Sequence, residues 1–363
     1  MNAQVDLIGK DGVKGAFAAD LISNSGGVFD PQRLRPFIHS DGKAYVTVYK
    51  GGDRSKPESY ESRPVTNATL RRDEWKHLDE ALLQISETRL NGIQDLIDKG
   101  LTYQLGNAMG TTVLEYHDIS DALEADMTMD GVTRGNNDRP DFQTNYLPIP
   151  IIHADYEINA RALAASRSLG NPLDTTMVER STRKVSEYLE NLLFTSTSFA
   201  FGGGTIYSYL NHPDRNQVTL TTGWDDSAKT SRQIVDEVRT LKQDSINDKH
   251  YGPWMLYIPT PYETVMDADY EDTGTTSTNQ TVRERILKVD GIQGVKVVDT
   301  LPADNVVMVQ MTSDVVRLVQ GMPIQNVQWD VEGQFLNKYK VMTIQVPQVR
   351  SDQAGNSGVI HLA

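Results

Sequence analysis

The sequence contains no cysteine among its 363 residues. A disulfide framework, a thiolate metal site and a cysteine nucleophile are therefore excluded. It also lacks a run of about 18 apolar residues, the length that a membrane-spanning helix needs. The first 30 residues lack the basic start and apolar block typical of an export signal. We expect no membrane partner, a cytosolic location when the chain is made, and stability that comes from packing.

Positive charge is also scarce, since 35 Lys and Arg residues face 49 Asp and Glu residues and the formal net charge is −14. Coating of nucleic acid by the whole surface is disfavoured, because such binding depends on phosphate neutralisation by Lys and Arg. A local basic patch stays open. The apolar fraction of 38% and charged fraction of 23% are typical of a folded protein, and the length allows two or three lobes.

Signatures of enzyme chemistry are missing as well. No two of the seven histidines have the three-to-five-residue spacing of helix-borne metal ligands; they are His39, His77, His117, His153, His212, His250 and His361. The glycines at 202–204 lack the following lysine and helix of a phosphate-binding loop, so we expect a hinge there. No G-x-S-x-G motif occurs. The acidic run from Asp267 to Asp272 lacks the glycine and closing glutamate of a calcium loop. We predict no enzyme, no metal and no cofactor.

The first half of the chain reads as an arm followed by a helix and a long loop. Residues 1–68 are rich in Gly, Ser, Pro and Asp, with one strand-like run at Ala44–Tyr49. Apolar residues at steps of three and four predict an amphipathic helix over 70–99, which Gly100 ends. Residues 111–152 have strand-like ends and a turn-rich middle, which predicts an extended two-stranded loop.

In the second half, helices give way to strands. A helix is expected from Asp174 to Thr195, with a capping box of Thr176 and Glu179 and a buried face of Val178, Val185, Tyr188 and Leu192. A helix over 230–246, a strand over 254–258 and short helices capped by Thr260 and by Thr281 follow. Six β-rich runs complete the chain, at 295–298, 306–311, 315–319, 327–331, 340–346 and 359–362. This order predicts the α+β class.

Two charged groups are candidates for contacts. Arg180, Arg183 and Lys184 form a basic stripe at helical spacing, although the neighbouring glutamates are typical of a solvated face. The long loop carries a second group, which is either a solvated face or one half of an interchain ion-pair set. Its members are Asp118, Asp121, Glu124, Arg134 and Arg139.

Five short motifs follow one another along the chain: Asp73-Glu74-Trp75 to Asp79-Glu80-Ala81, Leu147-Pro148-Ile149-Pro150, Asn171-Pro172-Leu173-Asp174, Tyr209-Leu210-Asn211-His212-Pro213 and Pro259-Thr260-Pro261-Tyr262. In this order they resemble the Hong Kong 97-type major capsid proteins of tailed double-stranded DNA bacteriophages and the related encapsulin shells. Each motif is weak alone, but together they cover about residues 70 to 363.

The resemblance implies a domain plan. Residues 1–68 would be the N-terminal arm, 69–114 the N-terminal helix and start of the peripheral (P) domain, and 115–150 the E-loop, which reaches over a neighbouring subunit. Residues 151–200 would be P domain with the spine helix, 201–322 the axial (A) domain, and 323–363 the C-terminal strands of the P domain.

It also implies a function. The chain would be a major capsid protein that assembles, as pentamers and hexamers, into the icosahedral head shell around a phage double-stranded DNA genome. It would be part of the virion, assembled in the host bacterial cytoplasm, with a portal, a scaffolding and a decoration protein as further partners. Arg180, Arg183 and Lys184 would face the DNA, and the charged loop residues would contact other subunits.

Three alternatives stay open: an encapsulin-type nanocompartment enclosing a cargo enzyme, a phage tail or baseplate structural protein, and a soluble enzyme. The length of the arm favours the phage capsid over the encapsulin. Some relatives join subunits covalently through an E-loop lysine, but no lysine occurs here between Lys99 and Lys184. We therefore predict a shell held by noncovalent contacts.

Overall fold

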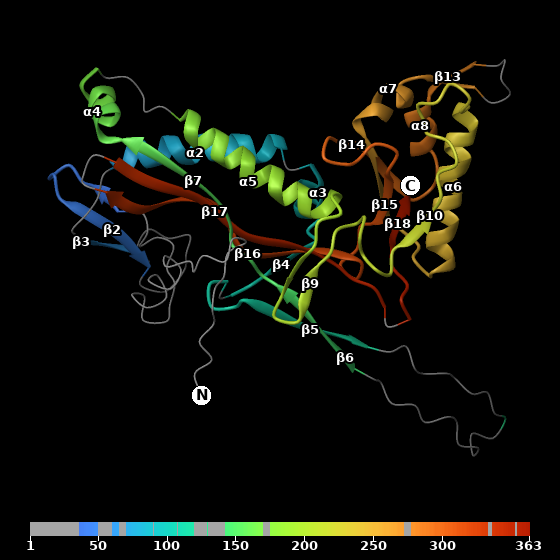
Figure 1. Cartoon of the computed structure of the whole chain (residues 1–363), viewed down its shortest axis with the longest axis horizontal. Helices are drawn as coiled ribbons and strands as arrows, with labels where there is room; N and C mark the ends of the chain where they lie inside the picture. Colours follow the sequence, from blue (N-terminus) through green and yellow to red (C-terminus); the bar gives the residue numbers. More distant parts are fainter. Residues whose placement is uncertain are drawn as a thin grey trace.

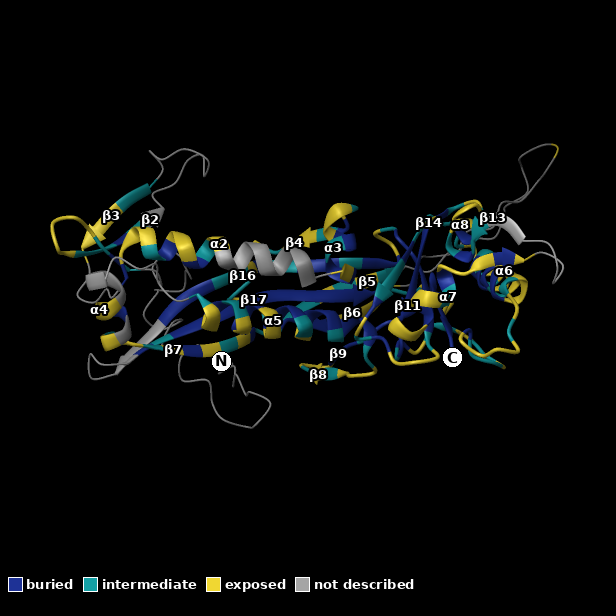
Figure 2. Cartoon of the chain, turned by 90° about the horizontal axis from the view of Figure 1, so that it is seen from above, coloured by how far each residue is buried: buried dark blue, intermediate teal, exposed yellow. Residues whose placement is uncertain are grey.

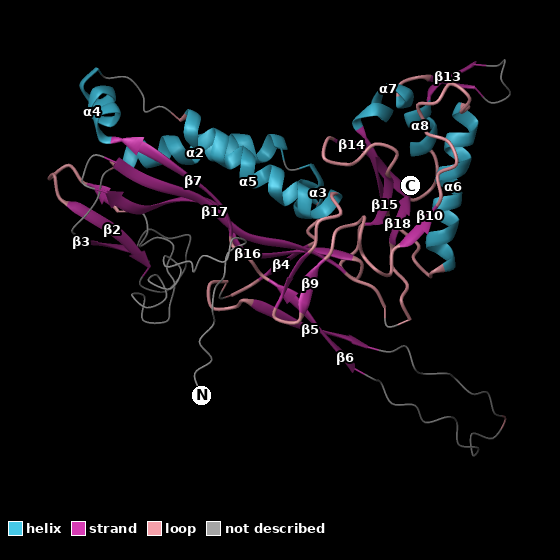
Figure 3. Cartoon of the chain, viewed as in Figure 1, coloured by secondary structure: helices cyan, strands magenta, loops and turns pink. Residues whose placement is uncertain are grey.

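The computed structural model describes residues 36–49, 60–64, 70–89, 91–106, 108–119, 129, 142–169, 175–271, 277–332, 336–352 and 354–363. Most of the predicted arm lies outside these ranges. The described chain is elongated, with a long sheet backed by helices at one end, a second lobe at the other and a hairpin that leaves the body (Figure 1). The structure contains both helices and sheets (Figure 3), which fits the predicted α+β class.

A four-stranded sheet forms the first lobe, in the order β4 (Thr102–Gln104), β16 (Val316–Glu332), β17 (Leu336–Val349) and β7 (Ile152–Asn159). The two β-rich runs expected at 315–319 and 327–331 belong to the single strand β16. Register shifts between Gln320 and Gln325 carry the pairing with β17 through the stretch that separates the runs, which contains Gly321 and Pro323. Such bulges accommodate an irregular stretch without ending the ladder.

Two helices cover one face of this sheet (Figure 1). Helix α5 (Thr176–Phe194) packs on β7 and β17, and α2 (Arg72–Arg89) packs on α5 and β16. The predicted helix over 70–99 is divided into α2 and α3 (Asn91–Asp98), and Gly100 follows α3 with a φ of 69°. That conformation is the one that favours glycine after a helix.

The second lobe is a five-stranded sheet in the order β10 (Asn216–Val218), β18 (Val359–Leu362), β15 (Val306–Gln310), β11 (Trp254–Pro259) and β14 (Ile292–Val298). All six residues of β11 are buried. Because strand side chains alternate, Trp254, Leu256 and Ile258 face a core beneath α6 (Ser231–Asn247) and α8 (Val282–Leu287). Met255 and Tyr257 face the core around α5. Figure 2 shows much of β16, β17 and β11 in dark blue, so the central strands of both sheets are buried.

Smaller elements complete the structure. The second lobe also contains the 3-10 turn η3 (Thr260–Tyr262), α7 (Glu263–Met266), β12 (Asp269–Glu271) and β13 (Ser277–Thr281). At the other end lie β1 (Phe37–Ile38), β2 (Ala44–Tyr49), β3 (Tyr60–Pro64) and α4 (Ala160–Leu169). Strand β2 confirms the strand expected at Ala44–Tyr49, but it is not the one strand of the arm, since β1 and β3 pair with it on either side.

A hairpin of β5 (Val113–Ile119) and β6 (Phe142–Pro148) forms the base of the predicted E-loop. A second hairpin, β8 (Phe199–Phe201) and β9 (Gly204–Ile206), packs on it. Gly202 and Gly203 make the turn of this second hairpin, with φ angles of 60° and 84°. The expectation of a hinge at 202–204 is therefore wrong: paired strands flank the glycines on both sides.

Other local expectations also need correction. The N-cap of α5 is Thr175 rather than Thr176, and it makes no capping hydrogen bond. Thr260 does not cap a helix, since its hydroxyl donates to Asp299 across the loop. Tyr188 is 44% exposed, because it lies opposite the buried face of α5. The capping box of Thr281 and Glu284 is confirmed.

Strand β18 lies in the five-stranded sheet, paired with β10 and β15. The predicted grouping of 323–363 with the P-domain strands therefore does not hold for residues 359–362. Likewise the start of β16, at 316–322, lies in the four-stranded sheet and not in the lobe expected for 201–322. The remaining domain boundaries stay predictions.

Candidate assembly surfaces

The exposed face of α5 carries the predicted basic stripe. Arg180, Arg183 and Lys184 are exposed, and the Lys184 Nζ lies 2.7 Å from a carboxylate oxygen of Glu187. Met177 and Tyr188, 43% and 44% exposed, lie on the same side of the helix. The opposite side, with Val178, Val185, Leu189 and Leu193, is buried in the core. The stripe is thus a solvent-facing band of mixed charge.

The hairpin of β5 and β6 is anchored at its base. Leu147 and Ile149 are buried in a core that includes Val319, Ile344 and Val346 of the four-stranded sheet. Gly204 of β9 lies close to the backbone of β6: a Cβ added to it would be 2.1 Å from the Tyr146 carbonyl oxygen. Further out, Phe142 and Tyr146 are 58% and 42% exposed.

Asp118 is the one member of the predicted charged loop group that the structure describes. Its Oδ1 lies 3.4 Å from Nη2 of Arg350, and its Oδ2 accepts a hydrogen bond from the amide of Asn145. The Asp118 side chain is 14% exposed. Its charge is thus paired within its own chain. Asp121, Glu124, Arg134 and Arg139 lie outside the described residues, so their predicted intersubunit contacts stay predictions.

Arg350 belongs to an arginine cluster on the face of the four-stranded sheet that lies over the hairpin base. We use this name for Arg317, Arg350, Gln348, Tyr103, Tyr116 and Asp118. The Nε of Arg317 donates to Gln348 at 2.6 Å. The Arg317 guanidinium lies 4.6 Å from the centre of the Tyr103 ring, and that of Arg350 lies 5.9 Å from the centre of the Tyr116 ring. Burial, and then the charge of Arg350, lower the pKa of Arg317.

A second charged cluster lies where the two lobes meet, and we call it the junction cluster. Asp95 on α3 is 4% exposed and accepts a hydrogen bond from the Tyr257 hydroxyl at 2.9 Å. It also forms an ion pair with Lys296 of β14. These contacts join α3, which packs on α5, to two strands of the other lobe.

Glu190 of α5 completes the junction cluster. Its carboxylate oxygens accept the backbone N–H of Gly92 at 2.9 and 3.2 Å. The pKa of Glu190 is raised to about 7. Burial raises it by more than the two backbone hydrogen bonds from α3 lower it. Gly92 allows this approach, since an added Cβ would lie 2.4 Å from the Phe194 ring.

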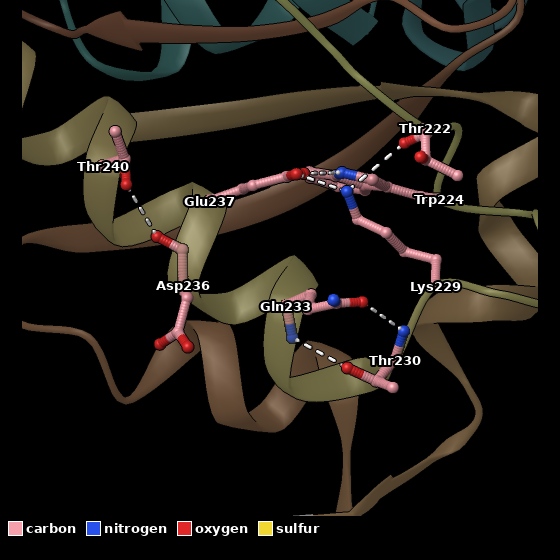
Figure 4. Close-up of polar contacts among 8 residues, drawn as sticks. All are labelled: Thr222, Trp224, Lys229, Thr230, Gln233, Asp236, Glu237 and Thr240. Carbon is pink, nitrogen blue, oxygen red and sulfur yellow. Dashed lines mark hydrogen bonds and ion pairs between the residues drawn. The ribbon is translucent and has the colours of Figure 1, made fainter.

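A third polar cluster fixes the loop before α6 (Figure 4). Glu237 accepts the indole N–H of Trp224 at 2.8 Å and pairs with Lys229, whose side chain is 6% exposed. Thr230 and Gln233 form a capping box at the start of the helix. Every charge in this cluster has its partner within the chain, so its role is structural.

Within the described ranges, no three His, Asp, Glu or Cys side chains are grouped to hold a metal ion. The same part of the chain has no helix that is long and apolar enough to cross a membrane.

Sequence reasoning located the α5 stripe and the hairpin but missed the junction and arginine clusters. The sequence did contain an indication of the junction cluster. Glu190 and Asp95 lie beside Leu189 and Leu96 on buried helix faces. An acidic residue at such a position indicates a buried carboxyl with a specific partner. The partners themselves come from distant parts of the chain.

Three solved structures share this architecture. The virus-like particle from Pyrococcus furiosus has a TM-score of 0.57 and 16% identity, covering 80% of this chain and 99% of that chain. The capsid of Myoviridae phage XM1 has a TM-score of 0.53 and 10% identity, and the match covers 69% of this chain and 85% of that chain. The capsid of the empty GTA particle has a TM-score of 0.51 and 13% identity, with 83% and 94% covered. No curated protein sequence matches.

These likenesses define the fold class. The chain has the Hong Kong 97-type fold of capsid and virus-like-particle subunits, as the sequence motifs predicted. By sequence it belongs to the family of unknown function DUF6260, whose model matches residues 65–362.

Proposed function

We propose that this chain is the major capsid protein of a tailed phage, a structural and non-enzymatic subunit that assembles into an icosahedral head shell. The fold supports the proposal, since it is the fold of subunits in two capsids and one virus-like particle. Such a protein acts by repeating one set of weak interfaces under symmetry, so the closed shell is more stable than any single contact.

The observation that carries the proposal is the hairpin of β5 and β6. Its strands pair only with each other in the described chain, and the outer residue Phe142 is 58% exposed. A lone two-stranded hairpin is marginally stable in water. A neighbouring subunit that packs against it would supply the missing burial, which is the role expected of an E-loop.

Further parts of the proposal concern partners. The exposed stripe of Arg180, Arg183 and Lys184 would reduce the repulsion between packaged double-stranded DNA and an acidic shell. A portal, a scaffolding and a decoration protein would complete the head, which would be assembled in the host bacterial cytoplasm and would form part of the virion.

Electron microscopy of the purified chain, with the nucleic-acid content of the particles measured, tests the function. Closed shells are expected, and DNA within them when they are taken from a producing host. Rings or tubes would favour a tail or baseplate protein. A monomer that stays compact at high concentration would overturn the proposal.

An encapsulin-type compartment is the second candidate, because the similarity to the Pyrococcus furiosus particle covers 99% of that chain. Shells that contain one cargo protein and no genome would favour it. For either shell, a denaturing gel is expected to show the single chain at 40.5 kDa. A ladder of covalent multimers would contradict the noncovalent assembly expected from the absence of lysine between Lys99 and Lys184.

A further inference from the structure

The arginine cluster contains two guanidinium groups and one carboxylate. Arg317 and Arg350 lie on one face of the sheet, because Arg317 pairs across the strands with Gln348 and Arg350 is two residues beyond it. Among the described residues, Asp118 is the one carboxylate that pairs with either arginine, and it pairs with Arg350. Arg317 has no carboxylate partner in that part of the chain.

The cluster is built to hold its arginines in place. Arg317 is fixed by Gln348 and by the ring of Tyr103, so its planar donor groups are presented in one orientation. The Nε of Arg350 is buried and makes no hydrogen bond with any residue that the structure describes. Arg317 is half-buried and Tyr103 is 42% exposed, so a group from outside the chain can reach them.

We propose that Arg317 receives a carboxylate side chain from a second copy of this chain. Arg317 and Arg350 are adjacent cations that are partly removed from water, and in the described chain Asp118 pairs with Arg350 alone. This leaves a local excess of positive charge, which a further carboxylate neutralises. The chain itself carries 49 acidic residues against 35 basic ones, so a second copy offers the complementary charge. The inference rests on the proposed shell function.

The position of the cluster favours a protein carboxylate over the phosphates of packaged DNA. Arg317 shares its face of the sheet with Val319 and Val346, whose core includes the hairpin base. Helix α5 covers the opposite face, where Leu318 and Val341 pack. Figure 1 shows the helix and the hairpin on opposite sides of β16 and β17. If the stripe on α5 faces DNA, Arg317 faces away from it.

The first test compares Arg317→Gln with Arg239→Gln, a matched loss of one positive charge on α6, where Arg239 pairs with Asp236 at the surface. Arg317→Gln is expected to raise the protein concentration needed for shell assembly about tenfold, the effect of losing one charge-assisted hydrogen bond. Arg239→Gln is expected to leave it unchanged. Both variants should melt as unassembled subunits within a few degrees of the parent. Equal assembly by all three proteins would overturn the proposal.

The second test remains valid even where Arg317→Gln fails to fold. Arg317→Lys keeps the positive charge and supplies a primary amine. In shells formed from a mixture of nitrogen-14 and nitrogen-15 chains, a carbodiimide joins the new amine to an adjacent carboxylate as an amide, with loss of water. Mass spectrometry is expected to find cross-links in which the peptide that contains position 317 carries one nitrogen isotope and its partner peptide carries the other. Such a pair joins two different chains. Cross-links of one isotope only, or none in intact shells, would overturn the proposal.

A free anion is the remaining occupant. If inorganic phosphate raised the melting temperature of the unassembled parent but not of Arg317→Gln, and mixed-isotope cross-links were absent, the site would be a phosphate site and the proposal would fail. If the parent formed no particles at all, the proposed function and this inference would both fail. Normal shells without mixed cross-links would overturn this inference alone.

Discussion

The junction cluster and the arginine cluster show two ways of using charge in one chain. At the junction, Asp95 is matched by Lys296 and Tyr257, and Glu190 by backbone N–H groups, so the contacts close within the subunit. Among the described residues, the arginine cluster leaves one positive charge, that of Arg317, without a carboxylate partner, beside a hairpin with exposed apolar residues. Contacts within the chain join the lobes, and we propose that neighbouring subunits complete the hairpin side. Four variants test this comparison.

The largest effect is expected from Phe194→Ala at the junction. The Phe194 ring is fully buried and lies 4.9 Å from the ring of Tyr257 in the other lobe. Its removal should lower the free energy of unfolding of the unassembled subunit by about 3–5 kcal/mol. Tyr188→Ala, on the exposed face of the same helix, should change it by less than about 0.5 kcal/mol. Urea denaturation measures both, and equal losses would show that the junction is not a core.

Glu190→Gln is expected to remove a pH dependence. The folded-state pKa of about 7 lies above the ordinary 4.5, so the folded chain binds more protons than the unfolded chain between these values. Stability from this group is therefore full below about pH 4.5 and falls as pH rises towards 7, by on the order of 3 kcal/mol. Glutamine retains an acceptor for Gly92 and carries no charge, so the variant should be more stable than the parent at pH 8.

The comparison for this variant is the difference in unfolding free energy between the variant and the parent, measured from pH 5 to 8. His361 also titrates differently on folding, since burial lowers its pKa to about 4, but it is present in both proteins and cancels in the difference. A difference that did not change across this range would contradict the assignment to Glu190.

Asp118→Asn should have a smaller effect at the hairpin base. The substitution leaves the guanidinium of Arg350 without its carboxylate, in a site where the two side chains are 24% and 14% exposed. We expect a loss of about 1–3 kcal/mol in the unassembled subunit. Glu187→Gln removes the exposed partner of Lys184 and should cost less than about 1 kcal/mol. If Asp118→Asn lowered the free energy of unfolding no more than this control does, the ion pair of Asp118 and Arg350 would not stabilise the fold.

The smallest effect on folding is expected when Arg180, Arg183 and Lys184 are all changed to Glu. All three are exposed, so unfolding free energy should change by less than about 1 kcal/mol. Shells should still assemble but retain less DNA, because negative charge replaces the stripe. The pair Arg232→Glu and Arg239→Glu on α6 serves as the control. Unchanged DNA content in the stripe variant would overturn the DNA-facing role.

Local patterns were sufficient for most elements. Periodicity predicted α5, α6, β2 and β11, and the order of elements predicted the α+β class and, through five short motifs, the fold. These features depend on residues within a few positions of one another, so they can be predicted from the sequence. The errors were local as well: the cap at Thr176 and the hinge at 202–204 depended on one hydrogen bond and one strand pairing that composition does not reveal.

Local patterns in the sequence indicated the main helices and strands, because side-chain polarity at fixed spacing favours one buried face. They also placed Tyr188 on the wrong face of α5 and did not indicate the hairpin of β8 and β9. The tertiary structure alone brings distant residues together. It placed β18 beside β10 and β15, Lys296 against Asp95, and Arg317 beside Arg350, whose carboxylate partner is Asp118. Asp95 and Lys296 are 201 positions apart. Contacts over such separations arise from sheet order and packing, which no short pattern encodes.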